Sequence, residues 1–348
     1  MMSSLERKPL LTIAIPTWNR ASYLRLNLNQ LAAQIDGLEL LVEILISDNC
    51  SSDETSSIVE NYIKGALPIK YVRNATNIGS DCNIAQCFNL ASGHYVMILG
   101  DDDLLVDGAL PMLLRILKES EYGVVSVRPY GYEDDFRREY PGGKGEILGY
   151  CDVGEFVKKL GVFSTLISAN IISKNFLTDE DARIYCGTNL VHTQLLYRAA
   201  IAAERNLWVD RYLVACKRNN SGGYIFSEVF VDNFGAILDE LRGNKISEAA
   251  IAQLERRLLM SYYPFYILRQ RMVAGEDLEV AWRRFYTRYS SYSIFWLCIA
   301  PILRLPRPLA LIWGAVVLVI GRSLDGDFLR GVKYMLNRIT NRLFRNSV

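Results

Sequence analysis

Histidine is nearly missing from this chain, since only two of its 348 residues are His. A metal site built from imidazoles is therefore almost excluded, because such sites usually take two or three of them. Cysteine does not supply the missing metal ligands either. The seven Cys residues are scattered and never spaced as Cys-x-x-Cys. That distribution argues against structural zinc and indicates a reduced, cytoplasmic protein.

The glycine-rich motifs that bind nucleotide phosphates are also missing. No Gly-x-Gly-x-x-Gly follows the first apolar run, which argues against a dinucleotide-binding fold, and PGGKG at 141–145 lacks the spacing of a P-loop. Residues 1–9 are polar and charged, so no secretory signal is visible. With 50% hydrophobic and 22% charged residues, the chain is neither disordered nor a disulfide scaffold.

The net charge of +1 conceals an asymmetry along the chain. Residues 1–230 carry 22 basic and 28 acidic side chains, whereas residues 231–348 carry 17 and 10. The first part therefore has a net charge of −6 and the second a net charge of +7. An acidic front and a basic, apolar rear indicate two tasks in one chain.

Apolar runs alternate with amphipathic stretches through the first hundred residues. The runs predict strands at 10–16, 41–47, 69–72 and 94–99. Apolar spacing of three and four predicts helices at 20–35, around 58–63 and near 81–91. This alternation is typical of a parallel sheet covered by helices. Further strands are expected at 122–128, 164–172 and 208–216, a helix near 188–205, and helices throughout 228–290.

Three consecutive carboxylates, Asp101, Asp102 and Asp103, follow directly on a predicted buried strand. Sheets of this class bind ligands at the carboxyl ends of their strands. Adjacent carboxylates repel one another, so they need a cation or hydrogen-bond donors to hold them. Hard oxygen ligands without His or Cys favour Mg²⁺ or Mn²⁺, and such an ion can neutralise a departing diphosphate. A solvated turn is the alternative interpretation.

Three more polar loops are expected at the same edge of the sheet, at 16–20, 48–53 and 74–83. Each alone would be an ordinary turn. Together they offer hydrogen-bonding side chains and helix N-termini, which suit a nucleobase, a ribose or a phosphate.

Residues 10–115 resemble the nucleotide-sugar half of family 2 glycosyltransferases with the GT-A fold. The residues that carry the resemblance, in the family's order and spacing, are IPTWNR (15–20), ISDNCSSDET (46–55), NIGSDCN (77–83) and LGDDD (99–103). The abequosyltransferase-like branch of bacterial O-antigen enzymes is similar also in FSTLISANIISK (163–174), YCGTNLVHTQL (185–195) and KRNNS (217–221). The resemblance implies an α/β fold with a mainly parallel, helix-covered sheet, and metal-dependent, inverting transfer of a hexosyl or deoxyhexosyl group from a nucleotide-diphosphate donor.

The resemblance also implies roles for single residues. Asp48 would accept a hydrogen bond from the nucleobase, and Asp101 would lie near the ribose. Asp102 aligns with the second Asp of the family's Asp-x-Asp motif and would bind the metal and act in catalysis, although Gly100 stands where that motif has its first Asp. The implied contacts to the nucleotide sugar are Pro16, Thr17, Asn19, Arg20, Asp48, Ser51, Asp53, Asn77, Gly79, Asp81, Asn83, Asp101, Lys217 and Arg218. The implied ligands of Mn²⁺ or Mg²⁺ are Asp102, Asp103 and Asn220.

The catalytic base is harder to assign. Inverting members of the family usually carry a Glu-Asp pair at the start of a late helix, and that position falls on His192-Thr193 here. A neutral imidazole can take the proton of an acceptor hydroxyl near pH 7, so His192 is the first candidate. His192 could instead bind the acceptor or serve only the structure. Asp179, Glu180 and Asp181 are the reserve candidates.

The chain changes character after residue 290. Two apolar runs, 294–303 and 309–320, are separated by RLPRP, and each is shorter than the roughly 20 residues of a spanning helix. Residues 328–345 then form an amphipathic pattern with one basic face. An in-plane or re-entrant membrane anchor explains this best, with a core helix or an oligomer interface as alternatives. We therefore expect a GT-A domain at 1–225, a helical extension at 226–290 and a membrane-associating segment at 291–348.

These expectations combine into one function. The protein would transfer a sugar to a hydroxyl of a lipid-linked oligosaccharide in bacterial O-antigen or related surface polysaccharide synthesis, at the cytoplasmic face of the inner membrane. Anchoring would raise the effective concentration of such an acceptor. A polyprenyl-phosphate glycosyltransferase and a degenerate nucleotide-sugar-binding scaffold are the alternatives. A nucleic-acid partner is not expected, because the basic residues accompany long apolar runs.

Overall fold

The computed structural model describes residues 8–143, 145–218, 223–273 and 275–324. The chain divides into two compact units, Met1–Gly222 and Gly223–Val348. The predicted metal ligand Asn220 and the amphipathic segment 328–345 lie outside the described residues.

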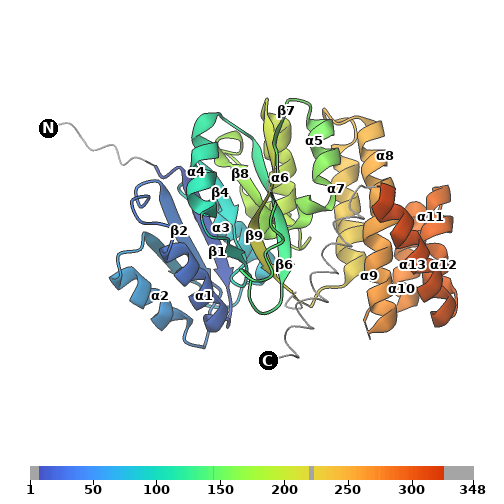
Figure 1. The fold of residues 1–348 in the computed structure, drawn as a ribbon, viewed down its shortest axis with the longest axis horizontal. Helices are drawn as coiled ribbons and strands as arrows, with labels where there is room; N and C mark the ends of the chain where they lie inside the picture. The colour runs from blue at the N-terminus through green and yellow to red at the C-terminus, as the bar shows by residue number, and fades with distance from the viewer. Residues whose placement is uncertain (1–7, 144, 219–222, 274, 325–348) are drawn as a thin grey trace. The chain divides into compact units, whose positions relative to one another are not determined.

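The first unit is built on a nine-stranded sheet (Figure 1). Four parallel strands begin it, in the order β3-β2-β1-β4, with bounds β1 Leu11–Thr17, β2 Val42–Asp48, β3 Ile69–Arg73 and β4 Tyr95–Ile98. The others are β5 Leu104–Leu105, β6 Val124–Tyr132, β7 Ile147–Tyr150, β8 Asn170–Ser173 and β9 Asn206–Lys217. Since β8 runs antiparallel to β4 and β6, the predicted parallel sheet is confirmed for the first four strands, and the whole sheet is mixed.

Helices cover both faces of this sheet. They are α1 Ala21–Ala32, α2 Thr55–Lys64, α3 Ser80–Leu90, α4 Ala109–Glu119, α5 Val153–Leu160 and α6 Val191–Ala202. Leu11, Ile13 and Ile15 of β1 share one core with the buried leucines of α1 and α4. Alternate residues of a strand point to opposite faces, so Ala14, also fully buried, faces the other layer. There α3 packs on β1 and β2, and α6 packs on β8.

The strand predicted at 164–172 is much shorter than expected. Residues Gly161–Thr165 and Ile167–Ala169 form 3₁₀ turns, and β8 begins only at Asn170. The hydroxyls of Ser164 and Thr165 donate to carbonyls three residues earlier, and the Asn170 amide donates to two carbonyls of the turns. These local bonds compete with strand pairing, which is why an apolar run interrupted by Ser and Thr did not extend.

The second unit is helical throughout its described residues, as predicted for 228–290. Its elements are a π-helical turn at Glu228–Asn233, α7 Phe234–Leu241, α8 Glu248–Arg257, a second π-helical turn at Leu258–Tyr262, α9 Tyr263–Met272, α10 Leu278–Tyr289, α11 Ser293–Cys298, α12 Ala300–Arg304 and α13 Arg307–Leu324. Among the described helices, α13 alone is long and apolar enough to cross a membrane, judged by length and composition only. This makes α13 a candidate membrane-associating segment.

We predict that Gly123→Ala destabilises the first unit. A Cβ at Gly123, just before β6, would lie 2.4 Å from the Ala199 carbonyl oxygen of α6. We expect a loss of about 1–3 kcal/mol in the free energy of unfolding. Gly149→Ala in β7 is the matched control, since its Cβ would meet nothing closer than 3.6 Å. Urea denaturation compares the two variants, and an unchanged midpoint for Gly123→Ala would contradict this packing.

Candidate active site

The loops that follow β1, β2, β3 and β4 meet at one edge of the sheet, as the sequence predicts. The Thr17 hydroxyl at the end of β1 donates to Asp101 at 2.8 Å, across 84 residues of sequence. The Asn19 amide donates to the Ser51 hydroxyl at 2.9 Å, and the Asn49 side chain donates to Asn77 at 2.8 Å. Four separate turns therefore form one hydrogen-bonded surface.

The three acidic residues after β4 take three different directions. Arg20 donates to Asp101 at 3.0 Å and to Asp102 at 3.3 Å, so one guanidinium joins two carboxylates. Asp103 turns inward, where the backbone N–H of Lys217 donates to it at 3.0 Å. Asp102 lies at the surface of the site, and its side chain is 13% exposed.

Burial and repulsion between the carboxylates raise the pKa of two of these groups toward neutral pH. Burial raises the pKa of Asp101 to about 6, opposed by the Arg20 guanidinium and reinforced by the charge of Asp102. Burial also raises the pKa of Asp103 to about 7, again with the Asp102 charge adding to it. A cation beside Asp102 would favour the charged form of all three groups.

Gly100 lies close to the carboxylates of Asp102 and Asp103. A Cβ at Gly100 would lie 3.1 Å from Asp102 Oδ1, 3.3 Å from Asp103 Oδ2 and 3.4 Å from Ser168 Oγ. Two carboxylate oxygens thus converge over the one residue that leaves the family's Asp-x-Asp pattern. Oxygen donors suit Mg²⁺ or Mn²⁺. No group of three His, Cys, Asp or Glu side chains able to hold a metal occurs among the described residues, so the remaining ligands would come from the substrate and water.

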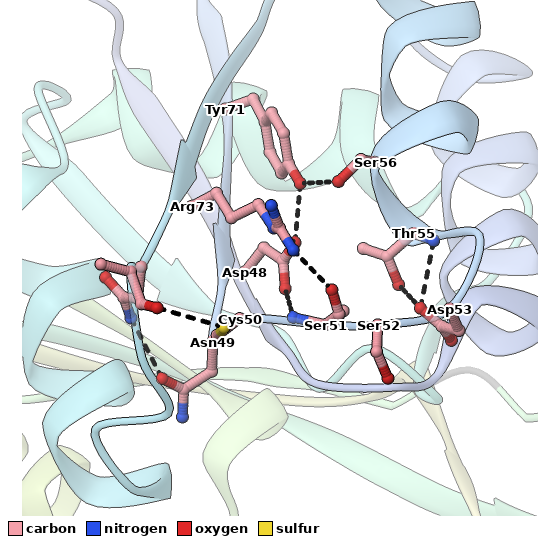
Figure 2. Close-up of polar contacts among 12 residues, drawn as sticks. Asp48, Asn49, Cys50, Ser51, Ser52, Asp53, Thr55, Ser56, Tyr71 and Arg73 are labelled. Carbon is pink, nitrogen blue, oxygen red and sulfur yellow. Dashed lines mark hydrogen bonds and ion pairs between the residues drawn. The ribbon is translucent and has the colours of Figure 1, made fainter.

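Asp48, the last residue of β2, is fully buried, and its carboxylate contacts the turn that follows (Figure 2). One of its oxygens accepts from the Ser51 amide at 2.8 Å, and the other accepts from the Tyr71 hydroxyl at 2.7 Å and pairs with Arg73. The contact of Asp48 with the nucleobase stays a prediction. In this structure Asp48 orders the turn, in which Cys50 adopts a left-handed φ of 65°.

The other predicted contacts of these loops divide into two groups. Asp53 accepts from the first backbone N–H groups of α1 and α2, at Ala21 and Thr55, and so fixes both helix ends. Asn83 is buried and bonds Ser47 on β2. Pro16, Asn19, Arg20, Asn77 and Gly79 remain at least partly exposed at the edge of the sheet. The first group shapes the site, and the second can meet a ligand.

His192 and Asp81 are both buried, and each presents an atom without a partner among the described residues. His192 Nε2 lies 3.0 Å from the Thr165 carbonyl oxygen, which can only accept, so Nε2 carries the proton and Nδ1 is the unpartnered acceptor. One Asp81 oxygen accepts from the backbone N–H groups of Gly187 and Asn189, and the other has no partner. Burial lowers the pKa of His192, and the Thr165 bond and the Asp81 charge oppose this shift. The imidazole is therefore neutral and positioned by α6 as an acceptor.

The reserve candidates for the base fit less well. Glu180 accepts from the Tyr185 hydroxyl and pairs with Arg198 at 3.4 Å, and Asp181 is held by Arg183. The side chain and backbone N–H of Arg183 donate hydrogen bonds to Asp181 and lower its pKa. Asp181 is therefore a poor proton acceptor. Asp179 is exposed on the same turn.

The basic pair at the end of β9, Lys217 and Arg218, lies close to the acidic cluster. Lys217 gives its backbone N–H to Asp103, and its ammonium donates to the Glu133 carbonyl over the ring of Tyr132. The backbone N–H of Arg218 donates to the Tyr132 carbonyl at 2.9 Å. Gly131 leaves room for the Arg218 side chain, because a Cβ there would lie 2.6 Å from its Nε.

Several residues that support the site were not predicted. Asn27 of α1 donates to the carbonyls of Gly100 and Asp103, and Ser168 accepts from the Gly100 amide. Asn27 stands at a buried position between the apolar residues Leu24 and Leu28, and a polar residue on the apolar face of a helix was the available signal. Thr165 acts through its backbone carbonyl, so its side chain gave no signal.

Comparison with known proteins identifies the family. A model of the family described as Glycosyl transferase family 2 matches residues 12–180. The abequosyltransferase RfbV of Salmonella typhimurium is 39% identical over 237 residues, which cover 61% of this chain and 67% of that protein. The chain belongs to glycosyl transferase family 2.

Two further proteins are similar to this glycosyltransferase. The GalNAc(5)-diNAcBac-PP-undecaprenol beta-1,3-glucosyltransferase of Campylobacter jejuni is 34% identical over 135 residues, 38% of this chain and 43% of that protein. The crystal structure of Staphylococcus aureus TarS 1–349 in complex with UDP-GlcNAc has a TM-score of 0.62 at 18% identity and covers 92% of both chains. The predicted GT-A fold is thereby confirmed.

We predict that His192 of the glycosyltransferase stays neutral at pH 6.5, with its proton on Nε2. Burial lowers its pKa below 6.5, so the charged form should appear only at lower pH. Nitrogen-15 NMR of the imidazoles reports both the tautomer and the titration. His94→Gln removes the second histidine and assigns the signals. A midpoint above 6.5, or a proton on Nδ1, would contradict the arrangement.

Proposed function

We propose that this family 2 glycosyltransferase moves a sugar from a nucleotide-diphosphate donor to a hydroxyl of a lipid-linked oligosaccharide. The observation that carries the proposal is the cluster after β4, where Arg20 joins Asp101 and Asp102 beside the end of β1. The nearby loops leave amides and hydroxyls exposed at the sheet edge, which suit a ribose and a base. The same cluster offers the carboxylates that a diphosphate-bound cation requires.

Asp102 and Asp103 are the residues that would hold Mg²⁺ or Mn²⁺, since their oxygens converge over Gly100. Such an ion supplies charge neutralisation to a departing nucleoside diphosphate. Arg20, Lys217 and Arg218 add positive charge around the same leaving group. Cations placed in advance where negative charge develops lower the barrier without reorganisation during the reaction.

His192 is the proposed base. Its Nε2–H is fixed on the Thr165 carbonyl, which leaves the Nδ1 lone pair for the proton of an acceptor hydroxyl. As the hydroxyl oxygen forms its bond to the anomeric carbon, the bond to the diphosphate oxygen breaks, and the hydroxyl proton passes to Nδ1. An in-line displacement of this kind inverts the anomeric centre. The Asp81 carboxylate stabilises the imidazolium that results, because its charge favours protonated His192.

The relatives and the C-terminal unit support the proposed acceptor. The Campylobacter relative is named for an undecaprenol-diphosphate-linked substrate, and the Salmonella relative is an abequosyltransferase. Helix α13 carries exposed apolar side chains that suit a membrane surface, including Leu309, Ile312 and Val319. We therefore propose action in O-antigen or related surface polysaccharide synthesis, at the cytoplasmic face of the bacterial inner membrane.

The donor site is tested first with Asp102→Asn. We expect one of CDP, UDP, GDP or dTDP to raise the melting temperature of the wild type strongly only when Mn²⁺ or Mg²⁺ is present, because a ligand that binds only the folded state stabilises it. Asp102→Asn should lose the metal-dependent part of that shift. Asp36→Asn, an exposed Asp away from the site, is the control. A metal-dependent shift that survives in Asp102→Asn would contradict the proposed ligand.

The base is tested with His192→Gln, which keeps a side chain of similar length. We expect transfer from the donor so identified to fall by about 10²- to 10⁴-fold in kcat, with nucleotide binding unchanged. The wild type should lose activity only when the pH falls through the lowered pKa of His192, since the base must be neutral, and the variant should lack this acid limb. His94→Gln is the control. Full activity of His192→Gln would show that another residue takes the proton.

A further inference from the structure

The second unit contains a groove that the transfer reaction does not use. It has a volume of 940 Å³ and lies among α8, the residues after α10, α11 and α13. Its walls are mostly apolar, formed by Met260, Leu297, Trp313, Val316 and Ile320, and Arg256 is among its lining residues. This volume is within the range of about 300–1,000 Å³ that small-molecule sites occupy.

Helix α13 forms one wall with its large side chains turned outward. Its buried face consists of the small or medium residues Ala310, Gly314, Val317 and Gly321. A Cβ at Gly321 would lie 2.3 Å from the Met260 carbonyl oxygen, so the backbones are in close contact there. The outer face carries Ile312 at 65%, Val316 at 48% and Ile320 at 50% exposure. Large apolar groups left outside the packed core indicate an apolar partner.

Arg256 gives this apolar groove one unneutralised charge. The neighbouring carboxylate, Glu255, is buried and already bound by Arg242, Arg288 and the Tyr292 hydroxyl. Arg256 itself has neither an ion pair nor a hydrogen bond with any residue that the structure describes. Residues 293–324 contain no Asp or Glu. A ligand that fits the groove therefore combines a hydrocarbon chain with an anionic head.

We propose that the groove binds one hydrocarbon chain of an anionic phospholipid, with the lipid phosphate against Arg256. A guanidinium binds phosphate through paired hydrogen bonds, and the apolar walls take the chain out of water. A peptide would need hydrogen-bond partners for its backbone, which these walls offer poorly. The site goes beyond the transfer reaction, since it requires no residue of the first unit.

The test uses the full chain and a short-chain phosphatidylglycerol with brominated acyl chains, kept below its micelle concentration. Bromine quenches tryptophan fluorescence at contact, so we expect saturable quenching. Trp313→Phe should remove most of the quenched signal, because Trp313 lines the groove. Trp18→Phe, in the first unit, should leave the quenching unchanged. Quenching that persists in Trp313→Phe would place the lipid elsewhere and overturn the proposal.

Two variants separate the charge from the chain. Arg256→Gln should weaken binding of the brominated phosphatidylglycerol by at least about tenfold, as expected for a hydrogen bond to a charged group. Arg283→Gln is the matched control, since Arg283 is exposed and does not line the groove. Ala252→Phe should abolish quenching by filling the space. Because Arg256 has no described partner and Ala252 is exposed, neither change should alter the melting temperature.

Three outcomes would overturn the proposal. Equal quenching by brominated phosphatidylcholine and phosphatidylglycerol, with no effect of Arg256→Gln, would show apolar adhesion without head-group recognition. Equal competition by inorganic phosphate alone would show a phosphate site with no lipid. A dimer in light scattering that dissociates in Ala252→Phe, without quenching by lipid, would show that a second copy fills the groove. The assay contains no nucleotide, so none of these results depends on sugar transfer.

Discussion

The ion pairs of Arg20 with Asp101 and Asp102 are the constraint on which the site depends. Three carboxylates in a row after a buried strand cannot all remain charged without positive partners. The protein distributes them: Asp101 pairs with Arg20 and Thr17, Asp103 turns inward to the Lys217 amide, and Asp102 stays at the surface. Each partner comes from a different part of the sequence. The requirement to neutralise one loop thus ties the ends of β1, β4 and β9 together.

The proposed base, His192, has the opposite requirement, because a base must be uncharged before it reacts. Burial removes the charge, and the Thr165 carbonyl selects the tautomer that leaves Nδ1 as an acceptor. Asp81 holds the segment before α6 through Gly187 and Asn189, so the same carboxylate positions the helix and favours the proton when it arrives. These surroundings meet both conditions that the proposed base requires.

The sequence predicted β1 to β4 and the meeting of their loops, because buried parallel strands appear as continuous apolar runs and their ends share one edge. It did not predict where side chains at those ends point. Tyr71 and Arg73 hold the Asp48 carboxylate, and the Lys217 amide holds that of Asp103, and these partners lie 23, 25 and 114 residues away. Periodicity describes one element at a time. It also missed β5 and β7, whose pairing with β9 depends on residues distant in sequence.

Helix α13 shows another limit of prediction from sequence. Its sequence is apolar all round, so a hydrophobic pattern cannot say which face is inside. Residue size decides, because only Gly314 and Gly321 allow the backbone of α13 to approach Leu268 and Met260. The larger apolar residues are then forced outward and form one wall of the groove beside Arg256. Close packing on small residues inside the second unit therefore leaves large apolar side chains exposed, and these form the surface that the proposed lipid chain would cover.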